Sequence, residues 1–239
     1  MKRFMISSGW ILAATFVLVL VFIPFDPGLS QRAQALPGSI VGFNQRITDF
    51  GTFRWMLYST GLFAIVAYIA ARFLMSSPYS ARVRTAWRLF AYFFLTIGSA
   101  SVFVHLLKFL IGRARPELFG EMGAYHLTPF TGDVLYESFP SGHSAAAGSF
   151  FGAFAMLIPR FRFAFMLLAL VIGVSRVIVG AHYPSDVAAG LLLGLWTAML
   201  LAFLFARKEW LFRLVKGWPH PKNAPLPADE PPVTGQRHG

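Results

Sequence analysis

Three short polar blocks stand out in a chain that is otherwise strongly apolar. They cover residues 108–116, 140–143 and 175–186, and each lies at or near the end of an apolar run long enough to cross a bilayer. A charged side chain near the centre of a membrane costs about 3 kcal/mol on insertion scales, so charges at such places mark a site or a pathway. The cations, histidines and acid of these blocks suit one kind of chemistry, which is to bind a phosphate group and transfer it.

The cations and the expected helix start in these blocks form a predicted phosphate-binding site. Arg115 and Arg176 each offer a planar fork of donors, and Lys108 offers a point charge. Ser141 and Gly142 lie where a helix is expected to begin, and the free N–H groups there favour an anion. Gly142 also lets the backbone approach the ligand closely.

The two histidines and one aspartate are predicted to carry the reaction. We expect His182 to be the nucleophile, because a covalent intermediate divides the slow attack of water on a phosphate dianion into two steps. Asp186 lies four residues further on, so one helical turn lets its carboxylate hold one imidazole nitrogen while the other attacks. His143 then suits the general acid that protonates the leaving alkoxide.

Each block also has a structural explanation. The first block is also explained by interfacial cations at a helix end, namely Lys108, Arg113 and Arg115, with Arg113 pointing away from Arg115. Pro-Ser-Gly-His alone is also explained as a helix cap followed by a buried histidine. His182 and Asp186 would also fit half of a metal site, but no second His/Asp pair at helical spacing supports one. The three blocks together, in order and on one membrane face, favour a phosphate site without a metal.

Two further groups of polar residues near these blocks are expected to be structural. His105, one turn before Lys108, is expected to pack between helices rather than to act in catalysis. The loop that joins the first two blocks is expected to be solvated, although it is placed to touch a head group, and its polar residues are Glu117, Glu121, Tyr125, His126, Asp133 and Glu137.

The three blocks resemble the signature of the type 2 phosphatidic acid phosphatase superfamily, which also contains bacterial acid phosphatases and vanadium haloperoxidases. The matching patterns are Lys-x6-Arg-Pro, Pro-Ser-Gly-His and Ser-Arg-x5-His-x3-Asp, and every signature position from Lys108 to Asp186 is filled. The resemblance implies a phosphatase without a metal or other cofactor that forms a phosphohistidine. It also implies the roles given above, namely His182, Asp186 and His143 in catalysis and Lys108, Arg115, Ser141, Gly142 and Arg176 in phosphate binding.

The composition indicates a polytopic membrane protein. Of 239 residues, 56% are hydrophobic and only 13% are charged, about half the share in a soluble domain. The mean hydropathy is +0.59. The chain has no cysteine, which excludes disulfides and thiolate metal sites, and its net charge of +11 clusters at membrane edges, which argues against nucleic-acid binding.

Six apolar segments predict an all-α bundle with six transmembrane helices, which we assign to residues 1–218. A tail rich in proline and polar residues, 219–239, is expected to be disordered. The expected spans are Trp10–Phe25, Met56–Met75, Trp87–Ile111, His143–Ile158, Phe163–Val179 and Val187–Phe205.

The basic residues predict the orientation of these spans. With both termini in the cytoplasm, 14 of the 21 Lys and Arg residues lie inside and 7 outside, as the positive-inside rule expects. All three polar blocks then lie on the outer face. The first span also resembles a cleavable signal peptide with a site near Ala33-Gln-Ala35, but its length, Pro24 and Arg32 favour an uncleaved helix.

We therefore expect a bacterial inner-membrane enzyme that dephosphorylates a membrane lipid on the periplasmic side. The candidate substrates are phosphatidate, phosphatidylglycerol phosphate, undecaprenyl diphosphate and lipid A, and the sequence does not separate them. Two alternatives stay open, a lipid phosphotransferase with the same intermediate and a transporter or binding protein for an anionic lipid. The oligomeric state is also open.

Overall fold

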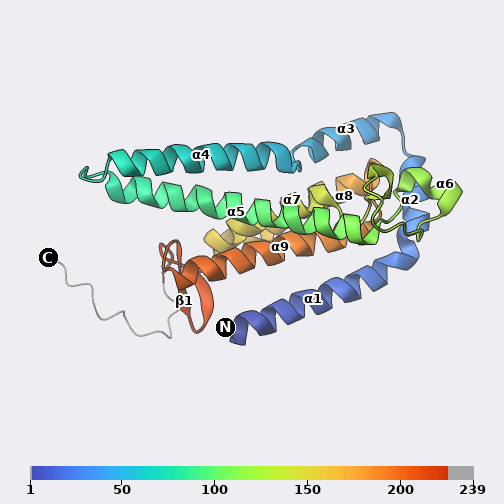
Figure 1. The fold of residues 1–239 in the computed structure, drawn as a ribbon. Helices are drawn as coiled ribbons and strands as arrows, with labels where there is room; N and C mark the ends of the chain where they lie inside the picture. Colours follow the sequence, from blue (N-terminus) through green and yellow to red (C-terminus); the bar gives the residue numbers. More distant parts are fainter. Residues whose placement is uncertain (1, 226–239) are drawn as a thin grey trace.

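The computed structural model describes residues 2–225 and shows a bundle of long helices with shorter elements at both ends (Figure 1). All six predicted segments are helical. The apolar runs predict them well because a long helix buries its backbone polar groups internally and needs no distant partner in lipid. These helices are α1 (Lys2–Phe22), α4 (Phe53–Phe73), α5 (Ser80–Ile111), α7 (Gly142–Leu157), α8 (Arg162–Ile178) and α9 (Pro184–Arg207).

Five helical stretches are long and apolar enough to cross a membrane. They are residues 3–34, 38–73, 80–111, 159–178 and 184–207. The remaining predicted span, α7, has 16 residues and is therefore about 24 Å long. The all-α bundle is confirmed, whereas six spans and cytoplasmic termini stay predictions.

The contact between α7 and α9 is close because glycines line it. A Cβ at Gly148 would overlap the carbonyl oxygen of Leu191, and one at Gly194 would overlap that of Ala145. Small residues at such positions let two helix backbones touch. The start of α7 is thereby pressed against the start of α9, the two segments that carry the second and third polar blocks.

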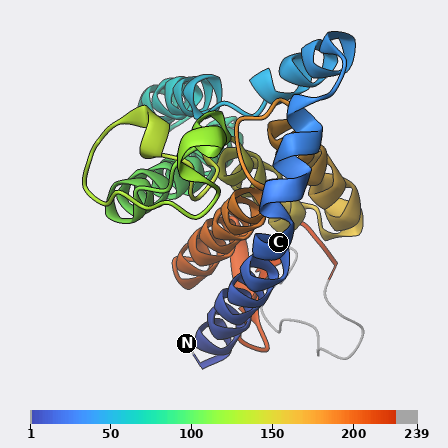
Figure 2. The same cartoon turned by 90° about the vertical axis from the view of Figure 1, so that its right-hand side faces the viewer.

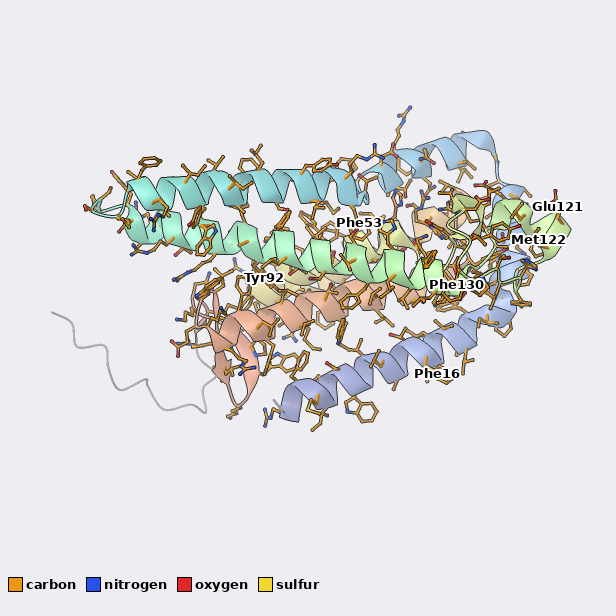
Figure 3. The ribbon with its side chains drawn as sticks, viewed as in Figure 1. Phe16, Phe53, Tyr92, Glu121, Met122 and Phe130 are labelled. Carbon is orange, nitrogen blue, oxygen red and sulfur yellow. The ribbon has the colours of Figure 1, made fainter. Side chains whose placement is uncertain are left out.

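Short helices gather at one end of the bundle, around the three polar blocks. Figure 2 looks onto this end and shows α2 crossing the ends of the long helices. In the side-chain view, Glu121 and Met122 lie at its outer tip, whereas Tyr92 lies between α5 and α9 toward the other end (Figure 3). The short elements at this end are η1 (Ile23–Phe25), α2 (Asp26–Gln34), α3 (Gly38–Asp49), η2 (Pro116–Leu118), α6 (Phe119–Met122) and η3 (Val134–Tyr136), and one further short helix, η4 (Pro159–Phe161), joins α7 to α8.

The opposite end carries a small β-hairpin that the all-α prediction lacks. Strands β1 (Phe212–Val215) and β2 (Trp218–Pro221) pair antiparallel. Lys216 and Gly217 between them have φ of 49° and 74°, as a two-residue hairpin turn requires. Phe212 is fully buried, with its ring centroid 5.2 Å from that of Tyr92. Residues 219–221 of the predicted tail thus form part of a strand, and residues 226–239 lie outside the described part.

Candidate active site

A cavity of about 590 Å³ lies among the three polar blocks, at the end of the bundle that carries the short helices. Four cationic side chains and one acidic side chain line it, so the cavity attracts an anion. Six of the eight predicted site residues are in its wall, namely Lys108, Arg115, Gly142, His143, Arg176 and His182. The rest of its lining comes from Thr52, Phe53, Arg54, Val104, His105 and Glu137.

The end of α5 positions Lys108. The helix stops at Gly112, whose φ of 62° is left-handed and where a Cβ would overlap the carbonyl of Thr128. The chain turns sharply there and leaves Lys108 in the last helical turn, 5% exposed. Its ammonium group donates to the carbonyl oxygen of Glu137, which holds the charge at the cavity wall.

The extended segment after Gly112 positions Arg115. Its backbone N–H donates to the carbonyl of Leu135 over 2.9 Å, and its Nε donates to the carbonyl of Val134 over 2.8 Å. These two bonds to one loop fix the direction of the side chain. The Nη groups make no hydrogen bond within residues 2–225, so they are free to bind an anion in the cavity.

The start of α7 contributes Gly142 and His143 to the cavity, but Ser141 is placed differently from the prediction. Ser141 is the N-cap, is fully buried, and its Oγ accepts hydrogen bonds from the N–H and the hydroxyl of Ser144. Its own N–H donates to the carbonyl of Asp186 over 3.0 Å. The side chain therefore caps the helix, while the free N–H groups behind it remain suited to an anion.

The end of α8 positions Arg176 and leads directly to His182. Arg176 is 8% exposed, and its Nη1 donates to the hydroxyl of Thr48 over 3.1 Å. Its buried Nε has no partner within residues 2–225. Gly180, with φ of 70°, turns the chain after α8, and the N–H groups of Ala181 and His182 both donate to the carbonyl of Arg176. A guanidinium and an imidazole thus come to one wall of the cavity.

His182 and Asp186 form a pair across the first turn of α9. Nδ1 of His182 lies 3.5 Å from Oδ2 of Asp186, the outer limit of a hydrogen bond, and Nδ1 has no nearer partner within residues 2–225. Catalytic hydrogen bonds are often this long before substrate binds. Burial lowers the pKa of His182 to about 3 and outweighs the opposing effect of Asp186, while the charges of Lys108 and Arg115 add to the lowering. The ring is therefore neutral at neutral pH, as a nucleophile must be.

The carboxylate of Asp186 is held from behind, away from the cavity. Its Oδ2 accepts hydrogen bonds from the hydroxyl of Ser138 over 2.6 Å and from the N–H of Tyr183 over 3.0 Å. Its Oδ1 accepts from Nη1 of Arg113 over 2.6 Å. The guanidinium of Arg113 also stacks 4.3 Å from the ring centroid of Tyr183. Although burial opposes it, the charges of Asp186 and Asp26 raise the pKa of Arg113, so the cation is permanent.

Several residues that contact the site carry no sequence signal for it. Asp26, Ser138 and Ser185 are fully buried beside Asp186 or Arg113. Asp26 and Ser138 lie outside the three polar blocks, and Ser185 is at an unspecified position of the third pattern. An acid at the end of the first apolar run is the one feature that marks Asp26 in advance. His105 lines the cavity with an exposed ring, so the expectation that it packs between helices is wrong.

The loop that joins the first two blocks is mostly solvated, as expected. Its members at positions 117, 121, 125, 126 and 133 are exposed, whereas Glu137 is half-buried and lines the cavity. Within residues 2–225, no three His, Asp or Glu side chains converge in a way that would hold a metal ion.

Comparison with known proteins places these residues in one family. Residues 88–210 match the family described as the PAP2 superfamily. The chain is 39% identical over 203 residues to a lipid A 1-phosphatase of Rhizobium johnstonii, which covers 84% of this chain and 82% of the relative. It is 40% identical over 205 residues to the lipid A 1-phosphatase of Rhizobium etli, covering 84% and 87%.

A solved structure shares the fold. It is the crystal structure of a transmembrane PAP2 type phosphatidylglycerolphosphate phosphatase from Bacillus subtilis. The two chains superpose with a TM-score of 0.55 at 20% identity, over 82% of this chain and 94% of that one. At this identity the likeness concerns the arrangement of helices alone.

Proposed function

The chain belongs to the PAP2 superfamily, and from this premise we propose that it removes the 1-phosphate of lipid A through a phosphohistidine on His182. It is a membrane lipid phosphatase, and enzymes of this superfamily work without a metal ion. The observation that carries the proposed mechanism is the cavity in which Lys108, Arg115 and Arg176 line the same walls as His143 and His182.

The first step is the transfer of the phosphoryl group to the enzyme. The cations bind the equatorial oxygens of the phosphate, where charge is stabilised as the group is transferred. The ring nitrogen of His182 that faces away from Asp186 attacks phosphorus, and the bond to the lipid oxygen breaks as the N–P bond forms. Binding of the phosphate dianion favours the protonated form of His143, which takes up a proton from solvent. His143 then donates this proton to the leaving oxygen, so the dephosphorylated lipid departs as an alcohol.

The second step returns the enzyme to its starting state. His143, now neutral, accepts a proton from a water molecule as that water attacks phosphorus. The N–P bond breaks, inorganic phosphate is released, and His182 is again a neutral imidazole. Asp186 balances the positive charge that the ring of His182 carries while phosphorus is attached.

The lipid part of the substrate has an apolar surface beside the polar cavity. A second cavity, of about 350 Å³, lies between α1, α5 and α9 and has almost purely apolar walls. Phe139 and Pro140 in its wall directly precede Ser141 and Gly142 in the chain, so the two cavities share one segment. An acyl chain suits the apolar cavity while the phosphate reaches the cations. The other apolar wall residues are Ile11, Leu12, Phe103, Leu107, Ala189, Leu192, Leu193 and Trp196.

Lipid A is the preferred substrate in this proposal because two relatives of similar length carry that activity in their names. We further propose six spans with cytoplasmic termini in a bacterial inner membrane, which puts the cavity on the periplasmic side. The support for this orientation is the excess of basic residues on the opposite side, 14 against 7.

A panel of purified lipids tests the proposal. The full chain in detergent with EDTA would be given lipid A, phosphatidate, phosphatidylglycerol phosphate and undecaprenyl diphosphate, and phosphate release would be measured. We expect kcat/KM for lipid A to exceed the other values at least tenfold, with mass spectrometry showing loss of the 1-phosphate. Faster turnover of another lipid would reject lipid A as the substrate. Transfer of phosphate to an added acceptor lipid instead of water would indicate a phosphotransferase.

A further inference from the structure

We propose that Asp26 and Arg113 form a positioning pair that holds Asp186, and through it His182, in place for phosphoryl transfer. The inference rests on the proposed role of His182 as nucleophile. The role of Asp26 has a second consequence, because Asp26 lies directly after the first apolar run. The first apolar run must then stay attached in the active enzyme, and we expect that it is not removed during export.

Arg113 is fully committed to this cluster. Its Nη1 donates to Oδ1 of Asp186 over 2.6 Å and to the hydroxyl of Ser185 over 2.7 Å. Its Nη2 donates to Oδ2 of Asp26 over 2.8 Å and to the carbonyl of Ala124 over 2.8 Å, and its Nε donates to the same carbonyl over 3.0 Å. A guanidinium has five N–H donors, so none remains for a substrate. Arg113 therefore acts on the reaction through Asp186 alone.

Asp26 fixes the far side of Arg113. It is fully buried, and besides Arg113 it binds Ser185, whose N–H donates to Oδ1 over 3.0 Å and whose hydroxyl donates to Oδ2. Ser185 also accepts from Arg113, so three side chains close a ring directly under the first turn of α9. A buried cation left without one of its carboxylates is strongly destabilised or moves. Loss of Asp26 would therefore shift Arg113 and the carboxylate that it holds.

The geometry gives this cluster a role beyond stability. Arg113 holds one carboxylate oxygen of Asp186, which orients the other oxygen, Oδ2, toward His182 at 3.5 Å. A displacement of about 1 Å at a reacting group costs on the order of 100-fold in rate. Removing Asp26 should thus slow the attack by His182 while phosphate binding, which uses other cations, stays intact.

The same contacts argue against cleavage of the first apolar run. Cleavage after Ala35 would remove Asp26 and leave Nη2 of Arg113 and the N–H of Ser185 without their carboxylate partner. It would also remove Gln34, whose side-chain amide donates to the carbonyl of Pro116 over 3.0 Å, directly after Arg115.

The test separates kcat from KM in the full-length protein. We expect Asp26→Asn to lower kcat about 10- to 100-fold with KM within threefold of the wild-type value. The probe is 32P-labelled lipid A, with labelled phosphatidate as a second probe, and a rapid alkaline quench follows label on the protein. Formation of phosphohistidine should slow by the same factor as kcat. Glu209→Gln, an exposed acid at the opposite end of the bundle, is the control and should keep the wild-type kcat.

Unchanged kcat in a folded Asp26→Asn protein would overturn the inference, and so would a loss confined to KM. If this variant does not fold, Ser185→Ala decides, because it removes only the hydroxyl contacts of the ring, and we expect a 3- to 10-fold loss of kcat. An unaltered kcat in Ser185→Ala would also reject the role. If the wild-type chain hydrolyses neither lipid, the proposed function is wrong. If the wild type is active and Asp26→Asn is equally active, only the proposed role of Asp26 is wrong.

The mass of the mature protein tests the second consequence. We expect the chain purified from bacterial membranes to retain residues 1–35 in intact-mass measurement. An active enzyme that begins at Leu36 would overturn the role of Asp26 directly.

Discussion

The two sides of Asp186 differ in how completely their polar groups are paired. Behind the carboxylate, every N–H of Arg113 has an acceptor. In front of it, buried Nε of Arg176 has no partner within residues 2–225, and Lys108 and Arg115 bind only backbone carbonyls. An unpaired buried donor costs about 1–3 kcal/mol, and Arg176 lines the cavity, where a bound phosphate can supply the missing acceptor. Pairing thus separates the arginine that positions Asp186 from the cations that face the cavity.

The largest expected effect comes from His182, which lies between the paired cluster behind Asp186 and the cations in front of it. The substitution His182→Ala should lower kcat at least about 10⁴-fold, because the covalent intermediate cannot form without the imidazole ring. Phosphate release from lipid A and labelling of the protein would both be measured. His220→Ala, in β2 at the opposite end of the bundle, is the control. Substantial residual turnover in the His182 variant would place the nucleophile elsewhere and break the comparison.

A change in front of Asp186 should be smaller and should affect a different kinetic constant from a change behind it. Arg176→Lys keeps the charge but loses the planar fork, and we expect kcat/KM to fall about 30- to 100-fold with a clear rise in KM. The matching exposed variant is Arg32→Lys in α2. A change in KM for Arg176→Lys together with a change in kcat for Asp26→Asn would support the distinction between binding and positioning residues. A change in the same constant for both variants would contradict it.

The smallest of the three expected effects concerns pH and the uncharged state of His182. Burial lowers the pKa of His182 to about 3, whereas an unfolded imidazole titrates near 6.5. The unfolded state therefore binds more protons between these values, and the free energy of unfolding falls as the pH decreases. Through this one group, lowering the pH from 7 to 5 should lower the free energy of unfolding by about 2 kcal/mol.

Thermal unfolding at the two pH values measures this effect. Between pH 7 and pH 5, the Tm of the wild-type protein should fall further than the Tm of His182→Gln, which has no ring to protonate. Equal losses in the two proteins would show that the ring is not desolvated in the folded enzyme.

The long helices could be predicted from the sequence and the short ones could not. Helices α4, α5, α8 and α9 follow from local apolar runs, and their ends lie within a few residues of the expected limits except at the start of α5. Helix α2 contains Pro27 and Gly28 and is held by distant partners, such as the contact of Asp26 with Ser185, 159 positions away. No local pattern encodes such a contact.

The front of the site could be predicted and the back could not, for the same physical reason. The groups that face a phosphate must be cations and imidazoles, and such residues are conspicuous in an apolar chain. Arg113 and Arg115 are two residues apart and identical in chemistry, yet one points behind Asp186 and the other into the cavity. Their directions depend on Asp26 and on the loop carbonyl of Val134, which only the folded chain brings near.

If α7 is a span, as the proposed six-span arrangement requires, its length has a consequence for the depth of the active site. At about 24 Å it falls roughly 6 Å short of a typical hydrocarbon core, and in that arrangement Arg160 and Arg162 directly after it would lie at a membrane boundary. His143 at its other end would then lie beneath the plane of the surrounding head groups. Because every residue of α7 is buried or half-buried among the other helices, this end of the cavity then lies inside the bundle, and a lipid phosphate must descend between the helices to reach it.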